Sequence, residues 1–406
     1  MSEAPRRRPW LGLSVTLLTQ VLATLTLSSV PVLAPAVAPQ LGLAPERVGL
    51  FTGLAYAVAM CSGLASGAWV ARHGPTRLMQ VVLACMALGA MVLVVAHPLV
   101  LLLAAAAMGV GYGVANPASA DILGRHAPVN APGLFFALKQ TGVPIGVALA
   151  GVLMPLGLAL VGWQGAALGV AGVGLLVMLA IQPAIAPLDG GRHATAVASV
   201  GWRASLTTVV RRPLLRTLGL VTFAFALTQQ AFLTFVVALL HLERGLPLAW
   251  AAGMLSASQV VCVGMRVAMG HVADRWVSPR VLLGSLGLCM AASCLALGLL
   301  PAQAPVPLVA GVVVLAGATT MGWNGVFFAQ LVRSVPREEL ADSAGATQFF
   351  IFGGAMLGPL LFGAMVHLGV SHALGYVLLA GLAGTAGWVM LRAPGAEPGA
   401  RSLENA

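Results

Sequence analysis

The sequence predicts an all-α membrane protein, with twelve transmembrane helices arranged as two pseudo-symmetric six-helix bundles. Three observations lead to this prediction: the composition, the length of the apolar segments, and an internal repeat. Hydrophobic residues make up 59% of the 406-residue chain and charged residues only 8%. A water-soluble protein of this length would need far more polar surface. The composition therefore favours a chain that lies mostly in lipid.

The charged residues gather in short islands, and long apolar segments lie between the islands. A helix of about 20 residues crosses a hydrocarbon layer roughly 30 Å thick. Because no water reaches the backbone there, each segment should be helical. The twelve predicted spans are Trp10–Ala34, Val48–Val70, Leu78–Ala96, Leu99–Leu123, Pro132–Leu158, Ala166–Ile185, Pro213–Leu240, Trp250–Val272, Val281–Leu300, Val306–Val332, Ala341–Leu368 and Ala373–Leu391.

The formal net charge of +10 is distributed unevenly between the two sides of the predicted membrane. Most basic residues fall on one side, and the opposite side has only Arg47 and Arg244, each next to a glutamate. This asymmetry predicts a multi-pass protein of a bacterial-type inner membrane with both termini in the cytoplasm, and it argues against a nucleic-acid partner. The basic residues assigned to the cytoplasmic side are Arg6, Arg7, Arg8, Arg72, Arg77, Arg125, Arg192, Arg203, Arg211, Arg212, Arg216, Arg275, Arg280, Arg333, Arg337, Arg392 and Arg401.

The cysteines and the N-terminus give no sign of another protein class. All five cysteines fall inside apolar spans, without the spacing of a metal site or a loop pair for a disulfide, so we expect no metal and no cofactor. The basic N-terminus resembles a secretion signal, with Ala36-Val37-Ala38 as a cleavage site. The apolar run is too long for such a signal and Pro39 would follow the cut, so we expect a retained first helix.

The second half of the chain repeats the first. An offset of 208 residues places Asn116 on Asn324 and Gln140 on Gln348, and an offset of 203 places Arg72 on Arg275. The predicted organisation is a first half over residues 1–185, a linker over 186–212, a second half over 213–392 and a tail over 393–406. Repeats of this kind place a solute site near the membrane midplane, between the halves.

Two loops related by the repeat share a sequence signature. The loop after the second predicted helix runs from Gly67 to Arg77, and the loop after the eighth runs from Gly270 to Arg280. Both resemble the G-x-x-x-D-R-x-G-x-x-R signature of the major facilitator superfamily of secondary carriers. The first loop departs from the signature, because Ala71 stands at the aspartate position, whereas the second keeps the aspartate as Asp274.

The resemblance implies the major facilitator fold in a monomer that moves a small-molecule solute across the lipid bilayer by alternating access, without enzymatic activity. In that family the loop holds the cytoplasmic gate in one state. The resemblance therefore implies gating roles for Asp274, Arg275, Arg280, Arg72 and Arg77. Asp and Arg make charge-assisted bonds to a neighbouring helix end. Since the alanine in the first loop cannot, we expect Asp274 to carry most of the gating electrostatics.

Ionisable residues inside a membrane span are costly, so each one is a candidate for function. No aspartate or glutamate lies near the middle of a predicted helix, which argues against an exporter of cationic drugs. Two cations lie within the spans: Arg266, and Lys139, which is the only lysine of the chain. The resemblance places their helices on opposite sides of a central cavity, where both would attract an anion. Alternatively, either side chain extends to the interface, or Lys139 pairs with Asp121.

Uncharged polar residues complete the candidate site. An amide without a partner is costly in hydrocarbon, so these side chains should face the cavity or one another. For Asn116 and Asn324, an equal alternative is that they support the break in a helix beside Pro117 and do not contact a solute. With Tyr112 as an aromatic wall, the amide candidates for solute contact are Gln20, Asn116, Gln140, Gln229, Asn324 and Gln348.

These residues favour a carrier of a small organic or inorganic anion, bound by Arg266 with Lys139. By analogy alone, the permease groups for cyanate-like and monocarboxylate-like anions are the nearest. Proton symport is compatible with this hypothesis, because a carboxylate substrate can itself carry the proton. One alternative is an exporter of neutral or amphipathic compounds, with a cavity dominated by Phe, Met and Trp and with Arg266 turned to the interface. Another is a non-transporting sensor, which would bind a ligand without accumulating it.

Overall fold

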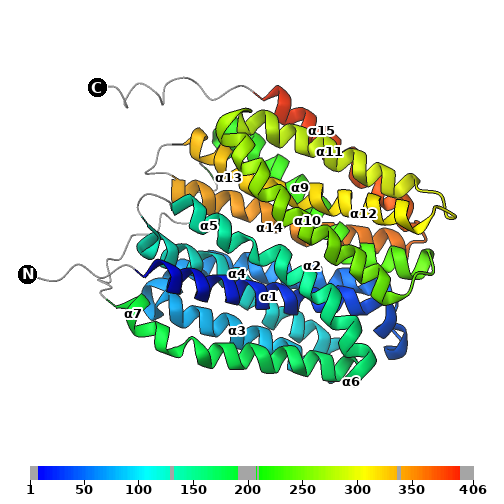
Figure 1. The fold of residues 1–406 in the computed structure, drawn as a ribbon, viewed down its shortest axis with the longest axis horizontal. Helices are drawn as coiled ribbons and strands as arrows, with labels where there is room; N and C mark the ends of the chain where they lie inside the picture. The colour runs from blue at the N-terminus through cyan, green and yellow to red at the C-terminus, as the bar shows by residue number, and fades with distance from the viewer. Residues whose placement is uncertain (1–7, 129–131, 191–206, 208–209, 336–339, 394–406) are drawn as a thin grey trace, which may run out of the picture.

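The molecule is a bundle of long helices that lie side by side along its longest dimension (Figure 1). The computed structural model describes residues 8–128, 132–190, 207, 210–335 and 340–393, and every regular element among these residues is helical. The first half of the chain, which we call the N-half, contains α1 (Pro9–Val37), η1 (Pro39–Leu41), η2 (Pro45–Arg47), α2 (Val48–His73), α3 (Pro75–Leu93), α4 (Pro98–His126), α5 (Pro132–Gln140), α6 (Gly142–Ala180), η3 (Gln182–Ala184) and α7 (Ile185–Asp189).

The second half, which we call the C-half, lies above the N-half in Figure 1, coloured from green to red. It contains α9 (Pro213–Ala238), the π-helical turn η4 (Leu239–Glu243), α10 (Leu248–Arg275), α11 (Pro279–Leu299), α12 (Val306–Met321), α13 (Trp323–Ser334), α14 (Leu340–His367) and α15 (His372–Arg392). Most of the predicted linker and tail, residues 191–206, 208–209 and 394–406, lies outside the described residues. The predicted boundaries of the two halves therefore stay predictions.

Eleven helical spans of the described residues are long and apolar enough to cross a membrane. The longest, Leu134–Asp189, has 56 residues and would measure about 84 Å as one straight helix, far more than a bilayer. Gly162 interrupts it with φ 74° and ψ 169°. A Cβ on Gly157 would lie 2.7 Å from the Cβ of Ala166, so the chain folds back on itself there. Counting this hairpin as two helices gives the twelve predicted crossings, and the all-α membrane fold is confirmed.

Proline sets many of the helix starts. A proline at the first helical position has no N–H to leave unpaired, and its fixed φ suits the helix. α1, α3, α4, α9 and α11 all begin in this way. The hydroxyl of Ser278 also caps α11 by accepting a hydrogen bond from the backbone N–H of Val281. The predicted spans began at the next strongly apolar residue, so several of them start one to three residues too late.

The predicted spans Pro132–Leu158 and Val306–Val332 each pass through a residue that separates two of the helices named above, and the backbone stays helical there. Thr141, between α5 and α6, has φ −66° and ψ −17°, and Gly322, between α12 and α13, has φ −74° and ψ −18°. Pro144 lies in the first turn of α6 and has no N–H to donate to the carbonyl of Gln140, four residues earlier. The carbonyl of Gln140 therefore lacks its intrahelical donor inside the bundle.

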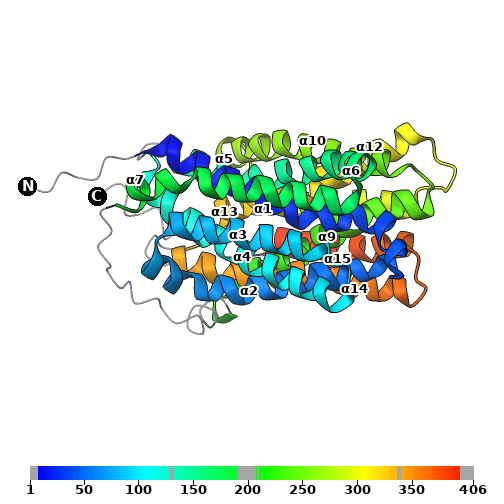
Figure 2. The same cartoon turned by 90° about the horizontal axis from the view of Figure 1, so that it is seen from below.

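The N-half and the C-half make backbone contact at the end of the bundle that carries Glu46. A Cβ on Gly49 of α2 would lie 2.3 Å from the carbonyl oxygen of Pro359 in α14. Figure 2 shows α2 beside α14 and α6 beside α10 in this arrangement. At the second contact, the hydroxyl of Ser256 in α10 donates to the carbonyl of Ala148 in α6 (2.9 Å). Small residues let the helices of the two halves approach closely here.

Candidate functional site

A cavity lies between the two halves, in two compartments of about 40 and about 70 Å³. A cavity needs roughly 10–15 Å³ by this measure to hold one water molecule, so the larger compartment accommodates several waters or one small solute. Tyr112 and Gln229 line both compartments. Seven of the nine residues predicted to contact a solute line the larger one: Arg266, Asn116, Asn324, Gln140, Gln348, Gln229 and Tyr112.

Arg266 projects from α10 into the larger compartment and is half-buried. Its Nε donates to the carbonyl oxygen of Met321, the last residue of α12, at 3.0 Å. One terminal nitrogen donates to the carbonyl oxygen of Gln140, the last residue of α5, also at 3.0 Å. Pro144 leaves the carbonyl of Gln140 without its intrahelical donor, and Met321 is the last residue before Gly322. The guanidinium therefore joins α12 of the C-half to α5 of the N-half across the cavity.

Lys139 is placed behind the wall of the cavity and is only 2% exposed. Its Nζ donates to Oε1 of Gln20 at 2.8 Å and to Oδ1 of Asn116 at 2.5 Å. The side chain therefore does not extend to an interface. Nor does it pair with Asp121, whose carboxylate instead accepts a hydrogen bond from Arg125 at 2.6 Å. Lys139 and Gln20 form a layer beneath Asn116, which lies between them and the solute space.

Donor-only neighbours orient two of the amides that face the cavity. A lysine ammonium can only donate, so the oxygen of Asn116 is engaged with Lys139 and its NH₂ group is left for the cavity. Gln229 is held in the same way, because its Oε1 accepts from the indole N–H of Trp323 at 3.1 Å and from Nδ2 of Asn324 at 3.4 Å. These contacts leave the NH₂ groups of Asn116 and Gln229 for the solute space, whereas Asn324 commits its NH₂ group to Gln229 and to the carbonyl of Met321 and leaves its oxygen.

The charge of the cavity wall is positive. Among the described residues that line the two compartments, Arg266 is the only charged residue and none is a carboxylate. Aromatic rings of both halves close one side, with Tyr56 edge-on to Tyr112 at 5.6 Å between centroids and Phe352 of α14 6.2 Å from Tyr56. The wall therefore combines one guanidinium, several amides and a few aromatic rings.

Sequence reasoning did not find Tyr56, which lines both compartments, as does Gln230, the neighbour of the candidate Gln229. A signal for each was present. Tyr56 is one of only three tyrosines in the chain, and it falls inside an apolar span. Gln230 follows Gln229 directly, and an amide in hydrocarbon needs a polar partner or a cavity.

The loop residues predicted to gate the cavity lie at the end of the bundle opposite Glu46, which we call the arginine-rich end. Arg72 and Arg77 are exposed there. Arg280, at the start of α11, donates to the carbonyl of Ala393, just after α15, so it joins two helices of the C-half. The side chains of Asp274 and Arg275 lie outside the described residues. Their gating role, including the prominence of Asp274, stays a prediction.

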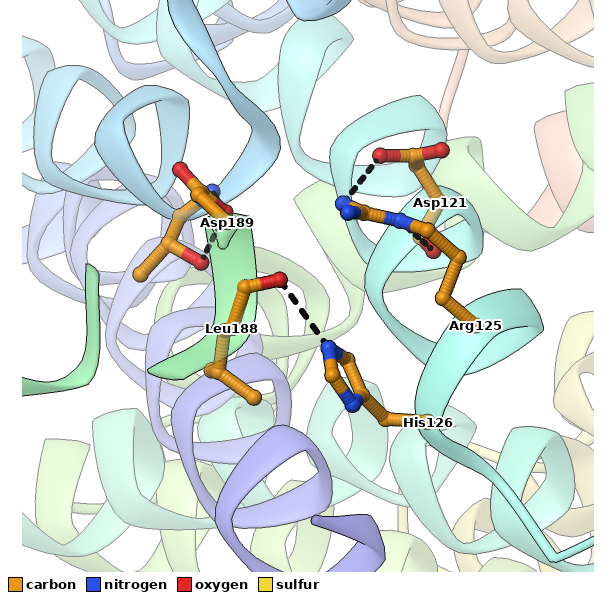
Figure 3. A network of polar contacts seen from close by, with 6 residues as sticks. Asp121, Arg125, His126, Leu188 and Asp189 are labelled. Atoms are coloured by element: carbon orange, nitrogen blue, oxygen red, sulfur yellow. Dashed lines mark hydrogen bonds and ion pairs between the residues drawn. The ribbon is translucent and has the colours of Figure 1, made fainter. Parts of the chain in front are cut away.

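Within the N-half, polar contacts join α7 to the start of α3 and to the end of α4 (Figure 3). The carboxylate of Asp189 accepts hydrogen bonds from the backbone N–H and the hydroxyl of Thr76, at 3.2 and 2.7 Å. Nε2 of the buried His126 lies 2.9 Å from the carbonyl of Leu188. Asp189 thus caps the start of α3, five residues after Ala71, and supplies a carboxylate to a loop whose own aspartate position is an alanine. Sequence reasoning placed Asp189 in the predicted linker over residues 186–212 and did not find this contact.

Comparisons with known proteins agree with this architecture. The chain is similar to two crystal structures of a bacterial homolog of the human lysosomal transporter Spinster. The inward-facing, occupied form is 15% identical, with 93% of this chain and 92% of that chain covered and a TM-score of 0.70. The inward-facing, unoccupied form is 16% identical, with 96% and 94% covered and a TM-score of 0.72. At such identity the likeness shows the fold.

A comparison with curated proteins finds no significant match. The family model of the Major Facilitator Superfamily, in contrast, matches residues 16–359, which is most of the chain. This match agrees with the loop signature, the helix count and the cavity between two halves. The chain therefore belongs to the Major Facilitator Superfamily of secondary transporters.

Proposed function

We propose that this protein carries a small anion across a bacterial-type inner membrane by alternating access, with the arginine-rich end in the cytoplasm. The observation that carries the proposal is a cavity wall that contains a guanidinium and, among the described residues, no carboxylate. Arg266 is its only charged residue among those described, and Asn116 and Gln229 spend their oxygens on neighbouring donors. Donors that converge without a carboxylate suit an anionic solute, because charge-assisted hydrogen bonds are roughly twice as strong as neutral ones.

The size of the cavity supports a small solute. A compartment of about 70 Å³ is suited to an anion of a few heavy atoms, such as cyanate or a short monocarboxylate. An exporter of amphipathic compounds would need a pocket dominated by Phe, Met and Trp, with Arg266 turned to the interface. Trp323, Phe328 and Phe352 do line the compartment, but they share it with Arg266 and several amides. The polar wall therefore favours the anion carrier over the exporter.

The arrangement of the halves supports alternating access. The backbone contacts of α2 with α14 and of α6 with α10 close the end of the bundle that carries Glu46. The structures of similar fold are described as inward-facing, both occupied and unoccupied. We infer that the present arrangement is likewise closed toward the outside. The positive-inside rule supports placing the arginine-rich end in the cytoplasm.

A thermal-shift screen of the detergent-solubilised protein tests the proposal. The probes are the sodium salts of formate, acetate, L-lactate, cyanate and nitrate, with chloride at the same ionic strength as the reference. A ligand at about 100 times its Kd stabilises the folded state by about 2.7 kcal/mol, which raises the melting temperature by several degrees. We expect one class of anion to stabilise the protein and Arg266→Gln to abolish the effect.

The matched control is Arg333→Gln, which makes the same change outside the cavity. Arg333 is exposed and donates to the carbonyl of Ala273 within the C-half, so its loss should leave the response to anions intact. If no anion in the panel stabilises the protein, or if Arg266→Gln responds like the unmodified chain, the anion carrier is refuted. The exporter of amphipathic compounds then becomes the first hypothesis.

A further inference from the structure

A second cavity, of about 250 Å³, lies within the N-half at the end of the bundle that carries Glu46. None of its described lining residues lines the solute cavity, because α1 separates the two spaces. Ser28 and Val32 of α1 face the solute cavity, whereas the next residues, Ser29 and Leu33, face this one. We call it the N-half groove, and its wall includes Ser29, Leu33, Arg47, Phe51, Leu102 and Trp163.

The wall of the N-half groove is almost entirely apolar. Among its described lining residues, the polar side chains are Ser29, Arg47 and the indole of Trp163. The hydroxyl of Ser29 is already engaged, because it donates to the carbonyl of Thr26 at 2.7 Å. A buried water needs several polar partners, whereas an apolar cavity of about 150 Å³ stays dry and takes up a hydrocarbon guest. The groove is therefore suited to a hydrocarbon chain.

The groove opens on the surface of the bundle that faces lipid. Leu50, Leu99 and Leu102 belong to its wall and are 55%, 67% and 41% exposed. Along α1 the groove extends from Ser29 to Ala38, which is about 14 Å at the rise of a helix. This length is about half of a hydrocarbon layer roughly 30 Å thick, and so matches one leaflet. An acyl chain of that leaflet can enter the groove without leaving the hydrocarbon layer.

Arg47 lies at the rim of the groove, at the end of η2, and is exposed. Among the described residues, its side chain makes no hydrogen bond or ion pair. The carboxylate of the adjacent Glu46 is turned to the C-half, where it lies 3.2 Å from Nδ1 of His367. Arg244, the other arginine predicted on this side, donates to two backbone carbonyls. Arg47 therefore leaves a positive charge without a partner where the groove reaches the end of the bundle.

We propose that the N-half groove binds an anionic phospholipid, with one acyl chain in the groove and the phosphate on Arg47. The second acyl chain stays in the bilayer, along the exposed leucines. A guanidinium forms charge-assisted, bidentate hydrogen bonds with a phosphate. A zwitterionic phospholipid also has a phosphate, but its ammonium group cancels the charge and finds the adjacent carboxylate of Glu46 already paired with His367. The net charge of the headgroup is therefore the property that Arg47 selects.

The site is independent of the solute cavity. Every described lining residue of the groove belongs to the N-half, so a bound lipid would remain in place while the two halves move against each other. The chain would fill the space between α1 and the hairpin of α6 and would stabilise the N-half. The proposal therefore stands or falls separately from the anion carrier.

Quenching of Trp163 by brominated lipids tests the site. The protein is placed in nanodiscs of phosphatidylcholine, and phosphatidylglycerol or phosphatidylcholine with brominated acyl chains is added at increasing mole fraction. Bromine quenches a tryptophan only at close range, and Trp163 lines the groove. The quenching that is lost in Trp163→Phe is the signal from the groove. We expect the brominated phosphatidylglycerol to bind about fivefold more tightly than the phosphatidylcholine, which is the factor for one arginine near a membrane surface.

Variants at both ends of the groove assign the binding to its parts. Arg47→Gln should make the two lipids quench Trp163 equally, and Arg47→Lys should keep a preference for phosphatidylglycerol. Ala34→Phe places a ring in the groove and should abolish the quenching of Trp163 by either lipid. The matched control is Arg333→Gln, which removes the same charge outside the groove and should keep the preference.

Three results would overturn the proposal. Equal quenching by both lipids in the unmodified chain would mean that the groove holds only an acyl chain of the surrounding bilayer. A preference that persists in Arg47→Gln would remove Arg47 from the site. Quenching of Trp163 that is absent with both lipids, or that persists in Ala34→Phe, would show that no acyl chain lies in the groove.

Discussion

Replacing Gly49 with alanine is expected to open the end of the bundle that carries Glu46. The new Cβ would lie 2.3 Å from the carbonyl oxygen of Pro359 and 3.2 Å from the ring of Phe235. Ordinary van der Waals contact begins at 3.4 Å, so α2 must move away from α14 by about 1.1 Å. Overpacking of this kind costs about 1–3 kcal/mol, which changes a population ratio about 5- to 150-fold. Because the clash exists only while the two helices are packed, it destabilises the closed end alone.

Spin labels at Leu99 and Leu368, which are 67% and 81% exposed and belong to different halves, would report this opening. Gly49→Ala should increase the population with the longer distance. The matched control is Gly253→Ala on α10, where a Cβ meets nothing within 4 Å. That change should leave the distances unaltered and stabilise the helix by about 0.5–1 kcal/mol. Equal distances in Gly49→Ala and in the control would show that the α2–α14 contact does not define the closed end.

Two further predictions concern side chains outside the cavity. Lys139→Met should weaken anion binding about five- to tenfold in the thermal-shift titration, because Asn116 loses the donor that orients it. A loss as large as that of Arg266→Gln would contradict its place behind the wall. Asp189→Ala should lower the free energy of unfolding by about 1–2 kcal/mol, since the start of α3 loses its cap. Asp121→Ala, which removes a partly exposed i,i+4 pair, should cost about 0.3–0.5 kcal/mol, and a similar loss for both variants in thermal unfolding would refute the cap.

Hydrophobicity and loop charge were sufficient to predict the twelve crossings, because the bilayer fixes the length of each helix. The carbonyl of Gln140 was missed as a hydrogen-bond acceptor for a physical reason. Pro144 lies inside an apolar segment, and hydropathy does not register a missing backbone hydrogen bond. The signal was present, since a proline inside a helix leaves the carbonyl four residues before it without a donor.

The sequence predicted which polar residues gather around the cavity, but not which of them line it and which lie behind its wall. Arg266 and Lys139 were both expected to face a solute, yet Lys139 and Gln20 lie behind Asn116. A helix that is apolar on all faces gives no sequence signal for the face that meets a cavity. The side-chain oxygens of Gln20 and Asn116 accept hydrogen bonds from the Lys139 ammonium. These bonds reduce the free-energy cost of burying its charge, so Lys139 needs no contact with a solute.

The preference of the cavity for an anion depends on residues that a solute would not touch. An amide offers a donor and an acceptor, so a wall of asparagine and glutamine has no preferred charge by composition. Lys139 behind Asn116 and the indole of Trp323 beside Gln229 remove that ambiguity for these two amides, because each can only donate and therefore engages the amide oxygen. The NH₂ groups that remain act with Arg266 as donors toward the same space. Substitution of the supporting donors would restore the ambiguity, even with every amide that lines the cavity still in place.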